Sequence, residues 1–392
     1  MKKLTNYEHT IYASYIGYIT QAIINNFAPL LFLSFAAEFK LTLDKITLIT
    51  TINFLVQLCV DLLSAKFIDR VGYRRSVVAA HIFCAAGLVG LALLPALLGS
   101  AYAGIMCAVV LYAIGGGIIE VLISPIVEAC PTAKKEAAMS LLHSFYCWGH
   151  VGVVIISTLF FRLAGIDNWR IMAIIWALVP IFNCFYFSLV PIYPIAGGHE
   201  PISIKGLFSQ KLFWIFMLLM VGAGASEQAM SQWASSFAES ALKVSKTLGD
   251  LAGPCAFALC MGTARALYGK HSDILPLRKI MTLSAFLCIA CYLCATLFNA
   301  PVMGLIGCAV CGFSVGIFWP GTFSLAAIKL PAAGTSMYAF MALAGDVGCS
   351  LGPTTVGLMA NAMGGDLKGG LIWALMFPLF ILLGLFLLRE KE

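Results

Sequence analysis

The chain has 392 residues, of which 61% are hydrophobic and only 11% are charged, and its mean hydropathy is +0.95. A soluble domain carries about a quarter charged residues, so this composition excludes a soluble protein and predicts an integral membrane protein. The net charge of +6 does not indicate a nucleic-acid partner, because its distribution follows a membrane topology.

Continuous apolar runs of about 20 residues, the length that a helix needs to cross a bilayer, recur along the whole chain. We predict an all-α membrane protein with twelve transmembrane helices in two pseudo-symmetric six-helix bundles. The expected spans are residues 9–37, 44–66, 75–98, 102–130, 137–162 and 169–192, followed by 211–238, 247–269, 277–298, 301–328, 333–360 and 370–388.

With twelve spans, most of the 24 Lys and Arg residues fall in the loops and ends on the same side as the N-terminus. Such an excess of positive charge is typical of the cytoplasmic side of a membrane protein. We therefore expect a monomeric protein embedded in lipid, in the cytoplasmic membrane of a bacterium, with both termini cytoplasmic.

The chain also shows signs of duplication around its midpoint. Residues 193–210 are the longest polar stretch with Pro and Gly, and we interpret them as a cytoplasmic linker between an N-terminal bundle (1–192) and a C-terminal bundle (211–392). Three local matches relate the halves: Gly149–Gly152 with Gly345–Gly348, Gly117 and Pro125 with Gly312 and Pro320, and residues 68–75 with 272–279. A duplicated six-span unit predicts a binding site at the repeat interface, near the bilayer midplane.

Glu120 lies inside an apolar run, about ten residues from the following basic turn and so about 15 Å deep at 1.5 Å per residue. A carboxylate at that depth costs at least about 2.5 kcal/mol unless it faces water or a partner. Its presence indicates substrate binding or proton transfer, since buried carboxyl groups can exchange protons near neutral pH. A structural carboxylate satisfied by a neighbouring helix is the alternative.

Other spans carry stripes of polar side chains. Asn53, Gln57 and Asp61 are spaced i, i+4 and i+8, so they share one face of a helix that must be turned toward protein or water. Amides both donate and accept hydrogen bonds, and an indole such as that of Trp319 offers a flat apolar face. This combination favours a neutral polyol or a sugar as the ligand.

The turn at residues 65–75 has the pattern A-x-x-x-D-R-x-G-Y-R-R. It resembles the loop between the second and third spans that is the signature of the major facilitator superfamily, with Ala65 and Tyr73 in place of a usual Gly and a usual basic residue. Residues 116–125 and 139–149 are similar to the fucose permease branch of sugar/proton symporters. The resemblance implies a twelve-helix transporter with Glu120 handling substrate or protons. The sequence departs from that branch at Asn25, where the branch has an Asp.

The candidate residues fall into three groups. Substrate binding is expected from Gln21, Asn25, Asn53, Gln57, Glu120, His150, Glu227, Gln228, Gln232 and Trp319. Proton coupling is expected from Glu120, His143 and Asp346, because a His–Glu pair can pass a proton near pH 7. A gating latch is expected from Asp69, Arg70, Gly72, Arg74 and Arg75. The alternatives are helix-to-helix hydrogen bonds for the His and Asp side chains, and ordinary positive-inside charge for the turn.

We expect a secondary active transporter that imports a small polar organic solute, with a sugar or sugar-like compound as the favoured class, by alternating access and with proton coupling. An uncoupled facilitator and a proton-driven exporter of a metabolite or drug are the alternatives with the same fold. An enzyme or a receptor is disfavoured, because the sequence offers no nucleophile–base pair and no soluble output domain. No cofactor or metal site is expected, and Cys291/Cys294 and Cys308/Cys311 are interpreted as apolar helix residues.

Overall fold

The computed structural model describes residues 6–132, 135–193, 204–271, 275–298, 300–330 and 334–388. Within these ranges the chain folds into helices joined by short connections, and no strand occurs. Ten segments of the described chain have the length and apolar composition needed to cross a membrane. The structure therefore agrees with the composition, which predicted an integral membrane protein.

The chain divides into two compact units. Unit 1 comprises residues 1–42 and 52–196, and unit 2 comprises residues 43–51 and 197–392. The helix Leu43–Val71 runs across this division without a break. Its residues 43–51 group with unit 2, and its remaining residues group with unit 1. Residues 194–203 of the expected linker lie outside the described residues, so the linker at 193–210 stays a prediction.

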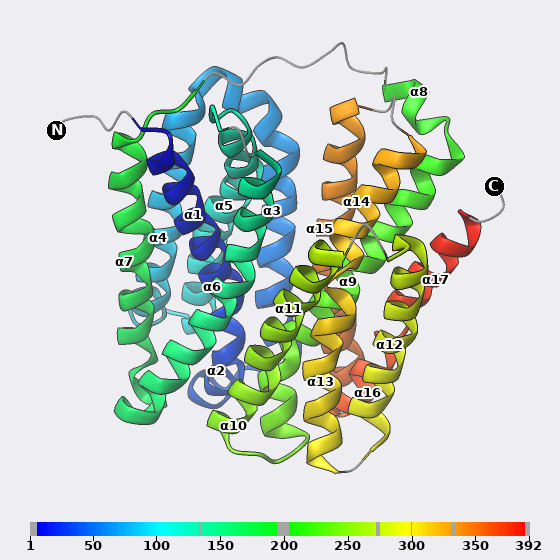
Figure 1. Ribbon diagram of the computed structural model, residues 1–392. Helices are drawn as coiled ribbons and strands as arrows, with labels where there is room; N and C mark the ends of the chain where they lie inside the picture. Colours follow the sequence, from blue (N-terminus) through cyan, green and yellow to red (C-terminus); the bar gives the residue numbers. More distant parts are fainter. Residues whose placement is uncertain are drawn as a thin grey trace. The chain divides into compact units, whose positions relative to one another are not determined.

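Unit 1 provides six membrane-crossing segments within the described residues (Figure 1). The first segment is interrupted near Pro29, which has no N–H to donate within a helix. The elements are α1 (Glu8–Asn26), the 3-10 turn η1 (Ala28–Leu31), α2 (Phe32–Phe39), α3 (Leu43–Val71), α4 (Tyr73–Leu97), α5 (Ala101–Glu128), α6 (Lys135–Ala164), η2 (Ile166–Asn168) and α7 (Trp169–Leu189).

Unit 2 provides six helical segments within the described residues, preceded by the short helix α8 (Ile204–Phe208), and four of the six meet the length and composition needed to cross a membrane. Three of the six are built from more than one helical element. The elements are α9 (Lys211–Ser240), α10 (Lys246–Asp250), the π-helical turn η3 (Leu251–Cys255), α11 (Ala256–His271), α12 (Leu277–Leu297), α13 (Pro301–Val315), α14 (Phe318–Lys329), α15 (Gly334–Ala362), α16 (Leu367–Trp373) and α17 (Met376–Leu387).

Two of the interruptions in unit 2 are explained by prolines that follow them. Proline cannot donate to the carbonyl four residues earlier, and its ring clashes with that carbonyl. Pro320 therefore disrupts the helix at Gly316, between α13 and α14, and Pro378 disrupts it at Ala374, between α16 and α17. The sequence prediction of single spans at 301–328 and 370–388 did not include these breaks.

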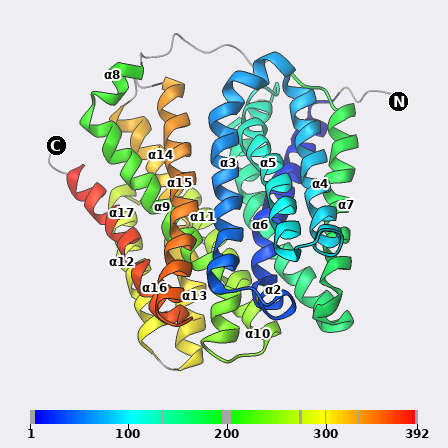
Figure 2. The same cartoon turned by 180° about the vertical axis from the view of Figure 1, so that it is seen from behind.

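The two units use the same packing scheme, as expected for a duplicated fold (Figures 1 and 2). In unit 1, α4 packs against α5 and α7, while α1 packs against α5, α6 and α7. In unit 2, α12 packs against α13 and α17, while α9 packs against α13, α15 and α17. Each helix of the first set has its counterpart at the same place in the second set. The prediction of two pseudo-symmetric six-helix bundles is confirmed.

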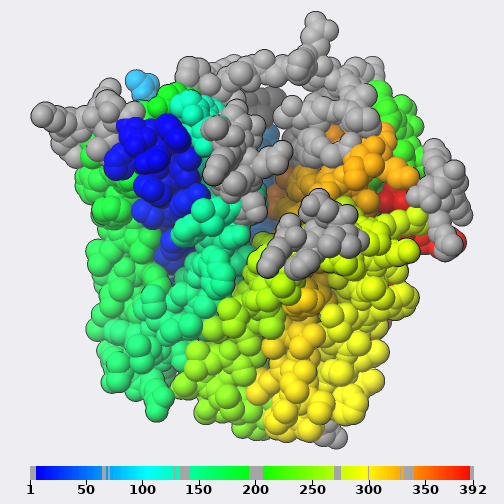
Figure 3. All heavy atoms as spheres, in the orientation of Figure 1, coloured from blue at the N-terminus to red at the C-terminus, as the bar shows by residue number. Residues whose placement is uncertain are grey.

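Glycines allow the closest of these helix contacts. A Cβ on Gly149 of α6 would lie 2.9 Å from Ala22 Cβ of α1, and Figure 3 shows the atoms of α1 (blue) and α6 (teal) adjoining on one face of unit 1. The matched glycines Gly117 of α5 and Gly312 of α13 allow two further contacts. A Cβ on Gly117 would lie 2.9 Å from Val60 Cβ of α3, and a Cβ on Gly312 would lie 2.0 Å from Phe257 O of α11. Small residues of this kind let membrane helices approach closely.

Candidate functional site

Four amide side chains of α1 and α3 form one buried network in unit 1. Gln57 and Asn53 donate to the same acceptor, Asn25 Oδ1, at 2.9 and 3.0 Å. Gln21 Nε2 donates to Gln57 Oε1 at 2.9 Å. All four side chains are at most 6% exposed, yet Gln21 Oε1 and Asn53 Oδ1 have no hydrogen-bond partner among the described residues. Such buried acceptors are costly unless a ligand or water satisfies them.

The network ends at a carboxylate on α5. Gln21 Nε2 donates to Glu120 Oε2 at 3.0 Å, so one amide joins the polar stripe of α1 to Glu120. Glycines of α5 permit this approach: a Cβ on Gly116 would lie 2.4 Å from Ile24 Cδ1. The structure thus brings four of the predicted polar residues of α1 and α3 together with Glu120, as the stripes in the sequence suggested.

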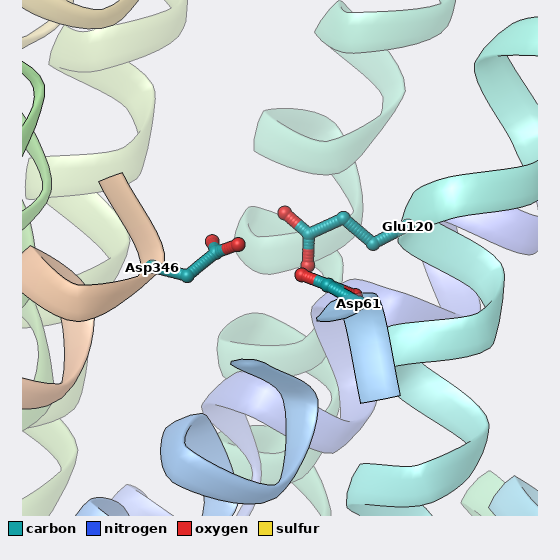
Figure 4. A group of neighbouring side chains, drawn as sticks. All are labelled: Asp61, Glu120 and Asp346. Carbon is teal, nitrogen blue, oxygen red and sulfur yellow. The ribbon is translucent and has the colours of Figure 1, made fainter. Parts of the chain in front are cut away.

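Asp61 of α3 is a second carboxylate at this site, and it was not among the predicted site residues. Oxygens of Asp61 and Glu120 lie within 4.8 Å of one another, and Figure 4 shows the two carboxyl groups pointing toward each other from α3 and α5. Two negative charges about 5 Å apart repel by about 3 kcal/mol at an effective dielectric of about 20. Two like charges this close are costly unless a proton or a cation offsets them. Both residues are half-buried.

The predicted histidines lie on α6. The ring of His143 packs against Tyr18, with 5.4 Å between ring centroids, and the Tyr18 hydroxyl contacts Ser124 Oγ at 3.1 Å. Ser124 is one turn beyond Glu120 on α5. His150 is buried, with 2% exposure. The proposed proton exchange between His143 and Glu120 stays a prediction.

A histidine of α4 forms a buried polar contact that the sequence prediction missed. His81 Nδ1 contacts Val77 O at 2.7 Å, and because a carbonyl can only accept, this nitrogen carries the proton. The other nitrogen, Nε2, then accepts from Asn183 Nδ2 at 2.8 Å, and the same Asn183 group donates to Ala13 O at 3.0 Å. The contact ties α1, α4 and α7 together, which is a structural role.

In unit 2 the polar stripe of α9 also forms a connected set. Gln232 Nε2 donates to Gln228 Oε1 at 3.1 Å, and Gln228 Nε2 donates to Glu227 Oε1 at 3.2 Å. Glu227 Oε2 lies 3.5 Å from Arg265 Nη2 of α11, which forms an ion pair. The three residues predicted from α9 are therefore joined to a guanidinium group that was not among the predicted site residues.

Arg265 is held at the break between α13 and α14. Its Nε donates to Gly316 O at 3.1 Å. That carbonyl is available because Pro320, four residues later, has no N–H to offer it. Pro320 in the tenth span therefore explains where Arg265 of the eighth span binds. A charged arginine within a span costs about 2.5–3.5 kcal/mol unless it has a polar partner of this kind.

Trp319 and Asp346 also belong to unit 2. A Cβ on Gly345 would lie 2.2 Å from the Trp319 ring, so α15 packs its backbone directly on the indole. Asp346, the next residue on α15, is buried, with 6% exposure. Its expected role in proton coupling stays a prediction.

The basic turn of unit 1 places Arg74 at the end of a neighbouring helix. Arg74 Nη1 donates to Phe187 O at 2.9 Å and to Ser188 O at 3.0 Å, in the last turn of α7. In unit 2 the matched Arg278 donates from Nη2 to Leu385 O at 3.0 Å, in the last turn of α17. Both arginines satisfy carbonyls that the helix leaves unpaired.

The other predicted gating residues divide into two cases. Gly72 joins α3 to α4 with a φ of +87°, a conformation that favours glycine, and the side chain of Arg75 is exposed. The side chains of Asp69 and Arg70 lie outside the described residues. The gating latch therefore stays a prediction.

A fold of two six-helix bundles with charged and amide side chains inside the spans defines a polytopic membrane transporter. The family model described as Major Facilitator Superfamily matches residues 14–353, so the chain belongs to that superfamily. Membership makes the protein a transporter of small molecules rather than an enzyme, as the signature turn at 65–75 predicted.

Three known proteins illustrate the similarity. Membrane protein MosC of Rhizobium meliloti is 22% identical over 261 residues, which cover 66% of this chain and only 62% of MosC. A bacterial homologue of the human lysosomal transporter Spinster has a TM-score of 0.76 at 14% identity, covering 98% of this chain and 97% of its own. The superfamily transporter FucP has a TM-score of 0.66 at 15% identity, covering 96% and 98%. At these identities the solved structures establish the fold.

Proposed function

We propose that the protein is a secondary active transporter that imports a small polar organic solute, a sugar or a sugar-like compound, together with protons. The observation that carries this proposal is the Asp61–Glu120 pair joined to the amide network of unit 1. Amide groups suit hydroxyl groups, because both donate and accept hydrogen bonds. The similarity to FucP supports the fold in which such a solute would be carried.

The carboxylate pair supports the proton coupling. A pair that shares one proton can release it or take up a second one with a modest change in its surroundings. Solute hydroxyl groups that bind Gln21 would alter the hydrogen bond that this amide donates to Glu120. Solute binding and protonation would thereby influence each other, which is what symport requires.

We also propose the membrane context of this activity. The distribution of Lys and Arg supports cytoplasmic termini and a bacterial cytoplasmic membrane, with a monomer as the working unit. The bundles at 1–192 and 211–392 would move by alternating access, and Asp69, Arg70, Gly72, Arg74 and Arg75 would form the latch at the turn.

Uptake into proteoliposomes tests the proposal. The solute is first chosen by a thermal-shift screen of hexoses, hexuronates and nucleosides on the purified protein, since a bound ligand stabilises the folded state. We expect an acidic exterior to raise accumulation of the solute at least about 10-fold. Glu120→Gln and Asp61→Asn should abolish this increase, because neither variant can form the carboxylate pair.

The exposed Glu8 provides the matched control, and Glu8→Gln should accumulate solute as the unmodified protein does. Equilibration without accumulation would identify a facilitator, and accumulation driven by an acidic interior would identify an exporter. Gradient-driven accumulation that survives in Glu120→Gln would contradict the proposed proton site.

A further inference from the structure

The guanidinium group of Arg265 in unit 2 has a geometry that suits a second binding partner. Its Nε is fixed on Gly316 O, which orients the plane of the guanidinium group. Its Nη2 then faces Glu227 Oε2 at 3.5 Å, which is longer than the roughly 2.8 Å of a tight charge-assisted hydrogen bond. The contact through Nε is thus closer than the ion pair through Nη2.

The ion pair is also partly open. The side chain of Arg265 is 21% exposed and that of Glu227 is 12% exposed, although both belong to membrane-crossing helices. A structural ion pair in a low-dielectric setting is stabilising only when its geometry is excellent and further hydrogen bonds satisfy the remaining groups of both partners. At 3.5 Å between Arg265 Nη2 and Glu227 Oε2, the pair lacks that close geometry, so a purely structural role explains it poorly.

The groups next to the Glu227–Arg265 pair suit the hydroxyl groups and the ring of a polyhydroxylated acid. Gln228 and Gln232 continue from Glu227 as a chain of amides, which can bind hydroxyl groups. The helix break at Gly316 lies three residues before the half-buried indole of Trp319. Broken helices with exposed backbone carbonyls are typical of substrate sites in transporters.

We propose that Arg265 binds a carboxylate of the transported solute, so that the substrate is an acidic sugar derivative rather than a neutral sugar. Glu227 holds the guanidinium when the site is empty and is displaced by the solute carboxylate. Guanidinium suits this role because its planar fork matches a carboxylate, which ammonium does not. This inference rests on the proposed function and specifies its substrate class.

Matched pairs of acid and neutral sugar test the proposal. D-glucuronate is compared with D-glucose, and D-galacturonate with D-galactose, by thermal shift and by titration calorimetry on the purified full-length protein. We expect the acid of each pair to bind at least about 10-fold more tightly than its neutral partner. Sites built to pair a polar group discriminate strongly against analogues that lack it.

Four variants separate the guanidinium from its surroundings. Arg265→Gln should weaken binding of the acid at least about 10-fold, and Arg265→Lys should lie in between. The double variant Arg265→Gln/Glu227→Gln removes both charges, which avoids an unpaired Glu227 in the folded protein, and it should lose the acid preference as well. Lys211→Gln, at an exposed position of α9, is the control and should bind as the unmodified protein does.

The outcomes distinguish this inference from the proposed function. Binding of the neutral sugars with no preference for the acids would overturn the inference and leave the proposed sugar transport intact. Unchanged binding of the acid in the double variant would also overturn it, because the guanidinium would then not be the receptor. Binding and uptake of neither class would contradict both proposals.

Discussion

Unit 1 and unit 2 share one packing scheme but differ in the charge that they carry at an equivalent position. The register that aligns residues 68–75 with 272–279 also aligns Asp61 of α3 with Arg265 of α11. Asp61 lies beside Glu120 as a second acid, whereas Arg265 lies beside Glu227 as a base. A duplicated scaffold has therefore kept its helix contacts and changed the chemistry at one position.

The same register shows what has been retained. It aligns Arg74 with Arg278, and each of them donates to carbonyls in the last turn of the sixth segment of its unit. Satisfying the end of a helix is a requirement of the fold, so it is common to both units. The charged residue beside the glutamate can differ between the units: Asp61 lies beside Glu120, and Arg265 lies beside Glu227. This difference gives unit 1 its proposed proton site and unit 2 its proposed site for a solute carboxylate.

The largest effect on stability is expected from the paired glycines. A Cβ at Gly312 would lie 2.0 Å from a backbone oxygen of Phe257, which cannot move without shifting α11. Gly312→Ala should therefore destabilise the protein by about 3 kcal/mol or more. Gly117→Ala should cost less, because the nearest atom is a side-chain carbon of Val60 at 2.9 Å. Thermal unfolding of the purified variants measures the order.

Gly152 is the matched control, since a Cβ there would meet no atom within 4 Å. Gly152→Ala should leave the melting temperature close to that of the unmodified protein. If Gly312→Ala melted no lower than Gly152→Ala, the close contact between α13 and α11 at Gly312 would be contradicted. The equivalence of the two units at this position would then fail.

A smaller effect is expected from the arginines at the helix ends. Arg74→Gln and Arg278→Gln should each cost about 1 kcal/mol, because a charged donor to the last turn of a helix is lost. The two costs should be similar, since each arginine donates to the last turn of the sixth segment of its unit. Thermal unfolding again provides the measurement, with the exposed Arg75→Gln as control. Equal melting temperatures for all three variants would contradict the capping role.

Much of the fold could be predicted from the sequence, because hydropathy, charge bias and turn signature are local properties. The apolar runs determined the helices, and the matched turns revealed the duplication. The amide stripes were also visible, since residues four apart share a helix face. That is why the contact of Gln21 with Gln57 and Glu120 agrees with the predicted grouping of these residues.

Asp61 and Arg265 show where prediction from sequence ended. Asp61 was recognised as part of a stripe, but its proximity to Glu120 depends on how α3 and α5 pack. Arg265 was not among the predicted site residues, because nothing in α11 alone shows that Pro320 exposes the Gly316 carbonyl to it. Contacts across helices with different axes cannot be derived from spacing along one helix.

The central claim is that the carboxylate pair of unit 1 couples protons and that Arg265 of unit 2 binds the carboxylate of the solute. Its most direct test compares Glu120→Gln with Arg265→Gln/Glu227→Gln in the same proteoliposomes, measuring both solute counterflow and pH-driven accumulation of labelled D-glucuronate. Counterflow requires solute binding and passage but no proton gradient. We predict that Glu120→Gln retains counterflow and loses accumulation, whereas the double variant loses both. Accumulation by Glu120→Gln, or full counterflow by the double variant, would contradict this division of roles.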